Sequence, residues 1–226
     1  MGASGVQGEL MSVMATTESE EAQPESEITL DLLDAVHANE THSQRTLAAE
    51  LGIALGLTNA YLKRCIRKGW IKAKQAPANR YAYYLTPKGF SEKSRLTSQY
   101  LSRSLKFYRQ ARNQMDGLLG AAAAAGWRRV VLIGRGDLAE ITLLCAMQHS
   151  VDIVGVVDPE AADGAQFMQK PVVADLASLP PFDVAMLTEL AAPQRTWERY
   201  LGAVPAGRLL APKLLKIEPA GGESRQ

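Results

Sequence analysis

Residues 130–140 have the pattern of a strand, a glycine turn and a helix in direct succession. The apolar run Val130-Val131-Leu132-Ile133 is followed by Gly134-Arg135-Gly136 and then by a helix-compatible segment. A continuous apolar run is typical of a strand buried on both faces, as in parallel sheets. Similar elements alternate after it, with apolar runs at 151–157, 171–174, 184–187 and 208–210 and helical segments at 138–149 and 193–201. This alternation predicts a small Rossmann-like parallel α/β domain over residues 126–217.

The glycine turn has the spacing of a phosphate-binding motif. Gly134, Gly136 and Ala139 fit G-x-G-x-x-A, in which the glycines allow a tight turn and a close approach of phosphate to the backbone. The N-terminus of the following helix offers free N–H groups to an anion. Asp158 ends the next predicted strand, where an acidic residue meets a ribose hydroxyl. The predicted ligand-binding residues are Gly134, Arg135, Gly136, Asp137, Leu138, Ala139 and Asp158.

The ligand itself stays open at this point. A nucleotide sugar and NAD(H) are the candidates, and an empty module in which the glycines only form the turn is the alternative. The negative charge of Asp137 opposes an anion there, whereas Arg135 offsets that charge or clamps a phosphate.

Charge is segregated along the chain although the net charge is only +1. Residues 1–42 carry nine acidic residues and no Lys or Arg, while residues 43–112 carry fifteen Lys or Arg and two acidic residues. Such a basic block favours a polyanion as partner. A solvated helical face is the alternative, but the acidic partners that such a face carries four residues away are nearly absent. We therefore predict that residues 43–112 bind double-stranded DNA. Residues 1–26 are predicted to be a disordered acidic tail and 218–226 a flexible one.

The basic block also has the element pattern of a DNA-binding fold. Helices are expected at 27–38, 44–51 and 54–68, strands at 70–74 and 80–85, and a long helix from 89 to 115 or 125. Ser43 is a suitable N-cap for the second helix, and Gly69 is a suitable C-terminal stop for the third. Three helices followed by a hairpin predict a winged helix-turn-helix over residues 27–90. Residues 54–68 would then lie in the major groove.

Helical spacing divides the third helix into two faces. Thr58, Leu62 and Cys65 are predicted to pack inward. Among the other residues, Asn59 and Arg64 suit base contacts, whereas Lys63, Arg67 and Lys68 suit phosphates. Arg80, beside the hairpin tip, suits a narrow minor groove. The predicted DNA-binding set is Gln44, Arg45, Asn59, Tyr61, Lys63, Arg64, Arg67, Lys68 and Arg80.

Two segments resemble known families. Residues 43–53, Lys68-Gly69-Trp70-Ile71-Lys72 and Tyr84-Leu85-Thr86-Pro87-Lys88-Gly89 resemble MarR-like winged-helix regulators associated with exopolysaccharide gene clusters. That resemblance implies operator binding, although Cys65 and the extra C-terminal domain depart from the pattern. Residues 130–175 are loosely similar to nucleotide-sugar-binding domains of bacterial acetamido-sugar-modifying enzymes. The domain order is similar to that of NADH-responsive redox-sensing repressors.

Residues 91–125 form a helical connector with a heptad-like pattern. Leu101, Tyr108 and Met115 recur every seven residues, with Leu105 and Leu119 between them. This pattern predicts either a homodimer seam or packing within one chain. Neither Cys65 nor Cys145 belongs to a disulfide framework, which favours the cytoplasm, and Cys65 is interpreted as a core residue rather than a redox switch.

No sequence pattern carries enzyme chemistry. Ser-His-Asp, Cys-His and metal-ligand clusters are absent, and no apolar run approaches the roughly 20 residues of a membrane helix. The sequence therefore predicts a transcriptional regulator that is not an enzyme and holds no metal. The first alternative is a ligand-free C-terminal scaffold that dimerises or binds a partner. The second is a nucleotide-sugar-modifying enzyme with an accessory basic domain.

Overall fold

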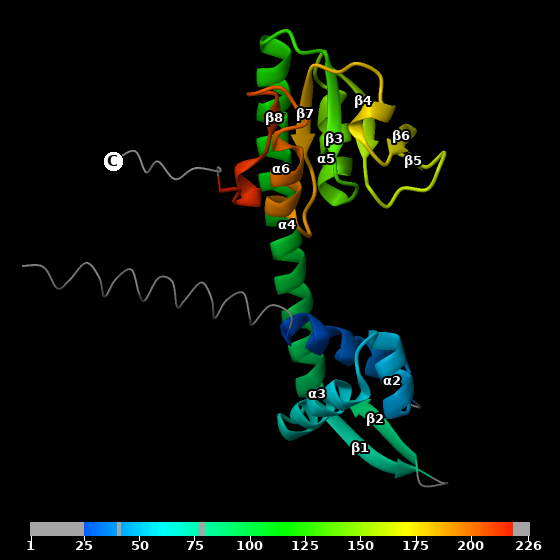
Figure 1. Ribbon diagram of the computed structural model, residues 1–226. Coiled ribbons are helices and arrows are strands. Elements are labelled where there is room, and N and C mark those ends of the chain that lie inside the picture. The colour runs from blue at the N-terminus through cyan, green and yellow to red at the C-terminus, as the bar shows by residue number, and fades with distance from the viewer. Residues whose placement is uncertain (1–24, 40–41, 77–79, 219–226) are drawn as a thin grey trace, which may run out of the picture. The chain divides into compact units, whose positions relative to one another are not determined.

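The computed structural model describes residues 25–39, 42–76 and 80–218, and its chain divides into two compact units. The first unit extends to Ser104 and the second begins at Leu105. Figure 1 shows helices and a hairpin in the first unit, and a sheet with helices in the second. The predicted tails at 1–26 and 218–226 lie almost wholly outside the described residues. In the part that the structure describes, no helix is long and apolar enough to cross a membrane.

The first unit is a winged helix-turn-helix, as the sequence predicts. A helix over residues 25–38 precedes α2 (Gln44–Leu51) and α3 (Leu55–Arg67). The strands β1 (Ile71–Ala76) and β2 (Arg80–Leu85) then pair antiparallel, and α4 (Pro87–Ala124) follows. Leucines of the three helices and Ile71 form its core, with Leu32, Leu33, Leu47 and Leu62 nearly free of solvent.

Local sequence signals fix where these helices begin and end. The Ser43 hydroxyl accepts a hydrogen bond from the Thr46 N–H at 3.1 Å, which confirms the predicted N-cap of α2. Gly69 follows α3 with a φ of +73°, the left-handed conformation of a helix stop. Thr86 caps α4 by accepting from the Gly89 N–H at 3.0 Å.

The helix α4 is 38 residues long and contributes to both cores. Leu96 is buried in the first unit, whereas Met115 and Leu119 are fully buried in the second. The prediction that Met115 belongs to an open seam is therefore wrong, because the α/β sheet needs this part of the helix as a cover. Leu101, Leu105 and Tyr108 remain exposed, at 54%, 52% and 41% of their surface.

The second unit is an α/β domain with a mainly parallel sheet. Its elements are β3 (Arg129–Ile133), α5 (Asp137–Ala146), β4 (Asp152–Val157), β5 (Gln166–Phe167), β6 (Lys170–Val173), β7 (Val184–Leu187), α6 (Pro193–Leu201) and β8 (Leu209–Leu210), with short 3₁₀ turns at Leu176–Ser178 and Lys213–Leu215. The strand order is β5-β6-β4-β3-β7-β8, and only the β5–β6 pair is antiparallel. The predicted strand–helix alternation is confirmed. The sequence analysis missed β5, which is two residues long and carries a polar Gln166.

The direction of the sheet changes beside its central strand. From β3 the chain moves through β4 to β6, and then returns to place β7 on the other side of β3. In open α/β sheets, ligands bind outside the carboxyl ends of strands at such a switch point. Gly134 follows β3 and Thr188 follows β7, so the predicted glycine turn lies at this position.

Candidate functional site

One face of α3 packs into the core of the winged helix. Thr58, Leu62 and Cys65 are at most 2% exposed, as the helical spacing predicts. Tyr61, one of the predicted DNA-binding residues, is also buried, with 8% of its surface exposed. The aromatic ring lies at the edge of the apolar face and joins the core cluster.

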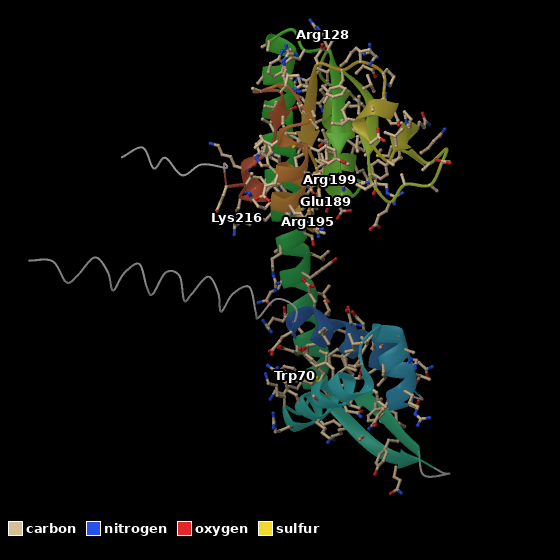
Figure 2. All side chains as sticks on the ribbon, in the orientation of Figure 1. Trp70, Arg128, Glu189, Arg195, Arg199 and Lys216 are labelled. Carbon is tan, nitrogen blue, oxygen red and sulfur yellow. The ribbon has the colours of Figure 1, made fainter. Side chains whose placement is uncertain are left out.

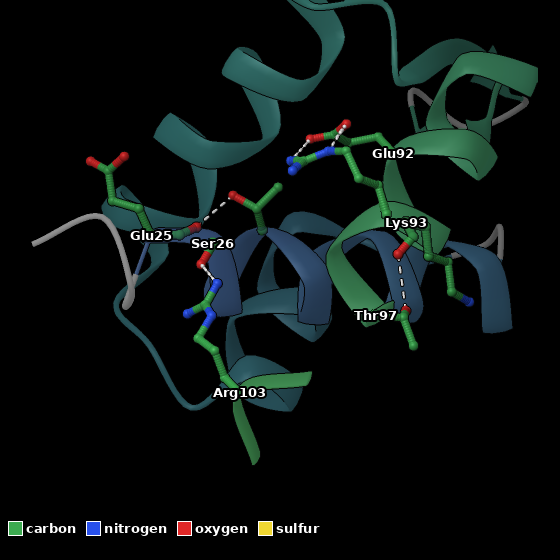
Figure 3. Close-up of polar contacts among 8 residues, drawn as sticks. Glu25, Ser26, Glu92, Lys93, Thr97 and Arg103 are labelled. Atoms are coloured by element: carbon green, nitrogen blue, oxygen red, sulfur yellow. Dashed lines mark hydrogen bonds and ion pairs between the residues drawn. The ribbon is translucent and has the colours of Figure 1, made fainter. Parts of the chain in front are cut away.

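Arg64 is held by the first helix of the domain. Its guanidinium Nη1 lies 2.8 Å from the Glu25 carboxylate, and that hydrogen bond raises the pKa of Arg64. The start of the same helix is fixed further by Thr29, which donates to the Glu25 carbonyl at 2.6 Å, and by Arg103, which donates to Ser26 at 3.4 Å (Figure 3). In the structure the Arg64 guanidinium is therefore paired with a carboxylate at the protein surface, where both side chains are about half exposed.

Asn59 is also poorly placed for base recognition. Its side chain is half-buried, and its carbonyl Oδ1 is buried without a hydrogen-bond partner among the described residues. A bidentate contact with adenine needs both the carbonyl and the amino group of the amide at the helix surface. The structure turns one of the two inward.

The remaining predicted contacts are mostly exposed. Lys63, Arg67 and Lys68 are exposed, and the Lys68 ammonium lies 4.5 Å from the centroid of the Trp70 ring. On α2, Arg45 is exposed and Gln44 donates to the Tyr83 hydroxyl at 3.2 Å. The side chain of Arg80 lies outside the described part of the chain.

Burial makes Cys65 unreactive in the folded domain. The side chain is 1% exposed, and desolvation raises the pKa of its thiol to about 11. Because the thiolate is the reactive form, we expect no reaction with a thiol reagent at pH 8 until the winged helix unfolds. Mass spectrometry of the alkylated peptide in buffer and in denaturant checks this. Rapid labelling of folded protein at Cys65 would contradict the core interpretation.

In the second unit, packing and backbone conformation together require a glycine at position 134. A Cβ built there would lie 2.6 Å from the backbone N and Cα of Glu189, and φ is +102°. Thr188 reinforces the contact, since its hydroxyl donates to the Gly134 carbonyl at 2.6 Å. Gly136 differs in packing, because a Cβ there would meet nothing within 4 Å, although its φ of +155° also disfavours a side chain. Sequence reasoning missed Thr188 and Glu189, which are far away along the chain and belong to no motif.

The structure brings Arg135 and Asp158 together. The Arg135 Nε lies 3.1 Å from Asp158 Oδ2, and Asp158 Oδ1 accepts from the Glu160 N–H at 3.0 Å. The carboxylate predicted to meet a ribose is thus paired with the arginine of the glycine turn. Leu138 and Ala139 are buried beneath the turn, whereas Asp137 is exposed at the start of α5.

Basic side chains gather at the same end of this unit. Figure 2 shows Arg195 and Arg199 of α6 at the end where Glu189 follows β7, and Arg128 at the opposite end, before β3. Both α6 arginines are exposed. Two exposed arginines of α6 therefore lie at this end of the unit, together with the carboxylates of Asp137, Asp158 and Glu189.

Comparison with known proteins identifies the first unit. Residues 25–72 match the family of winged helix-turn-helix DNA-binding domains. The match does not extend to the MarR-like subfamily or to an exopolysaccharide association. No curated protein is similar enough in sequence to match the chain.

Solved structures similar to the chain share little sequence with it. A protein of unknown function from Listeria innocua Clip11262 is 18% identical with a TM-score of 0.33, covering 48% of this chain and 84% of that one. PigF with SAH is 14% identical with a TM-score of 0.32, covering 89% of this chain and 77% of that one. Human N-acetylserotonin methyltransferase in complex with SAM is 13% identical with a TM-score of 0.31, covering 93% and 81%.

These likenesses correct one prediction from the sequence. The absence of catalytic motifs predicts that the chain is not an enzyme, but four of the similar structures are named as methyltransferases, three of them as O-methyltransferases. That prediction is contradicted and is withdrawn. At these identities and TM-scores the likenesses assign no activity to this chain.

Proposed function

We propose that this chain is a transcriptional regulator whose winged helix binds double-stranded DNA. The observation that carries the proposal is the exposed face of α3, on which Lys63 and Arg67 lie in a domain that matches DNA-binding winged helices. Among the described residues, no ion pair engages either side chain. The resemblance of residues 43–53 and 68–72 to MarR-like regulators supports an operator of surface or exopolysaccharide genes as the target.

Salt dependence of binding tests this proposal. Each neutralised phosphate contributes about −0.9 to the slope of log K against log salt, so about six contacts give a slope near −5. We expect Lys63→Ala and Arg67→Ala each to weaken binding to duplex DNA by about 1–3 kcal/mol. Lys213→Ala, an exposed lysine of the second unit, is the matched control. Fluorescence anisotropy over a salt series measures the slope and the affinity of each variant. A slope near zero would refute the proposal.

We further propose that the glycine turn of the second unit binds a ligand with a phosphate and a ribose. The open space at Gly136, the Asp158 carboxylate and the arginines at that end of the unit support it. A nucleotide sugar and NAD(H) stay the proposed ligands. Calorimetry of the full chain with these ligands and with S-adenosylmethionine tests the proposal.

The expected results of calorimetry follow from the geometry. Asp158→Ala should weaken a ribose-containing ligand by about 1–3 kcal/mol, because it removes a charged hydrogen-bond acceptor. Gly136→Val should abolish binding, because its side chain would fill the space that a phosphate needs and its φ of +155° also disfavours a side chain; its melting temperature checks that the unit stays folded. Asp163→Ala, an exposed acid of the loop after β4, is the control. No heat with any of these ligands would favour the ligand-free scaffold.

A homodimer is part of the same proposal. Winged-helix regulators that read two half-sites bind as dimers. Leu101, Leu105 and Tyr108 on α4 supply the proposed seam, since they are exposed and recur at helical spacing.

A further inference from the structure

The exposed face of α3 carries small residues at one end and cations at the other. Thr58, Tyr61, Leu62 and Cys65 mark the core side of the helix. Helical geometry places four residues on the opposite side, and all four are exposed: Gly56, Ala60, Lys63 and Arg67. A Cβ built at Gly56 would meet nothing within 4 Å.

The polar residues on the two flanks of this face are engaged elsewhere. Arg64 is paired with Glu25, and the carbonyl oxygen of Asn59 is turned into the protein. Lys63 and Arg67 are in no ion pair among the described residues. On α3, Lys63 and Arg67 are therefore the cations that can contact a base edge or a phosphate without first leaving a protein carboxylate, as Arg64 would have to leave Glu25.

The low profile of Gly56 and Ala60 matters because of their place along the helix. The N-terminal residues of a recognition helix are those that contact base edges in the major groove. With no side chain at Gly56 and a single methyl at Ala60, the backbone of α3 can approach the floor of the groove closely. An alanine methyl also makes a favourable contact with the C5-methyl of thymine.

We propose that Gly56 and Ala60 form the close-approach surface of α3 in the major groove, with the Ala60 methyl on a thymine methyl. Lys63 then contacts the O6 and N7 of a guanine next to that thymine, and Arg67 contacts the flanking phosphate. This inference rests on the proposed function. It adds which residues determine specificity and which base each one reads.

The structure separates binding from folding at Gly56. A leucine there meets open space and replaces a poor helix former with a good one, so the free protein should keep or gain thermal stability. In the complex the same side chain would hold α3 away from the bases. Gly117 of α4 is a matched control, since it is helical and exposed and a Cβ there also meets nothing within 4 Å.

The first experiment measures DNA affinity and melting temperature of the full chain for Gly56→Leu and Gly117→Leu. The DNA is an operator duplex selected with the wild-type protein. We expect neither variant to melt below wild type and only Gly56→Leu to lose affinity, by about tenfold or more. Wild-type affinity in Gly56→Leu would overturn the inference while leaving DNA binding intact. Absence of salt-dependent binding by the wild type would instead overturn the proposed function.

The second experiment tests the thymine contact directly. Replacing each thymine of the selected duplex in turn with deoxyuridine removes one C5-methyl group and leaves the hydrogen bonds unchanged. We expect one position to lower wild-type affinity by about threefold or more, and Ala60→Gly to abolish that difference. Ala121→Gly, at an exposed helical alanine of α4, should retain it. Equal sensitivity to deoxyuridine in wild type and Ala60→Gly would overturn the assignment of Ala60.

Discussion

Gly134→Ala is expected to destabilise the α/β unit by about 2–5 kcal/mol, the sum of backbone strain and overpacking. The added Cβ would lie 2.6 Å from the Glu189 backbone, in a chain segment whose φ of +102° already disfavours any side chain. The Gly134 and Glu189 backbones cannot move apart freely, because Thr188, next to Glu189, holds them together. Thr188 is 1% exposed, and its hydroxyl donates to both the Ile133 and the Gly134 carbonyls. The expected result is accelerated hydrogen exchange across β3 and β7.

Two comparisons make this result specific. Gly202→Ala should leave the α/β unit unchanged, because a Cβ there meets nothing within 4 Å and φ is −91°. The winged helix has its own core, so its exchange rates should also match the wild type in Gly134→Ala. Full stability of Gly134→Ala without any ligand would contradict the packing argument and return the glycine to a purely ligand-binding role.

The glycine turn illustrates what a sequence can reveal about this fold. A strand, a tight turn and a helix were predictable from adjacent residues, because apolar runs and glycine spacing are local signals. The contact of Gly134 with Glu189 was not, since it depends on β7 returning beside β3 after three other strands, β4, β5 and β6, along the chain. The Arg135–Asp158 pair has the same origin, as it joins the ends of two neighbouring strands.

The recognition helix shows a similar division. Spacing alone correctly predicted the burial of Thr58, Leu62 and Cys65. It did not anticipate that Tyr61 joins the core or that Arg64 pairs with Glu25, because both residues lie at the borders of the two faces, where partners from distant segments decide the environment. Glu25, which holds Arg64, belongs to an acidic segment that charge counting had placed in a separate tail. Local periodicity therefore locates the exposed surface of α3 but does not select which side chains on it lack a protein partner.

Leu119→Ala is expected to cost about 2–5 kcal/mol of stability, whereas Leu105→Ala on the same helix should cost less than about 0.5 kcal/mol. Leu119 is fully buried against the α/β core, and its truncation leaves a cavity in a closely packed region. Leu105 is 52% exposed and has no comparable contacts to lose. Chemical denaturation of both variants measures the difference.

The same two variants separate packing within one chain from the proposed dimer seam. If Leu105 pairs with a second copy, light scattering should show a higher dimer dissociation constant for Leu105→Ala. The denaturation midpoint of this variant should stay near that of the wild type when both are measured at concentrations where the wild type is monomeric. Leu119→Ala should instead lower the denaturation midpoint at the same concentrations, because the Leu119 side chain is packed within its own domain. A wild-type protein that stays monomeric with and without DNA would refute the seam. Of the heptad-like residues of α4, Met115 and Leu119 would then have the packing role, in the core of the α/β unit.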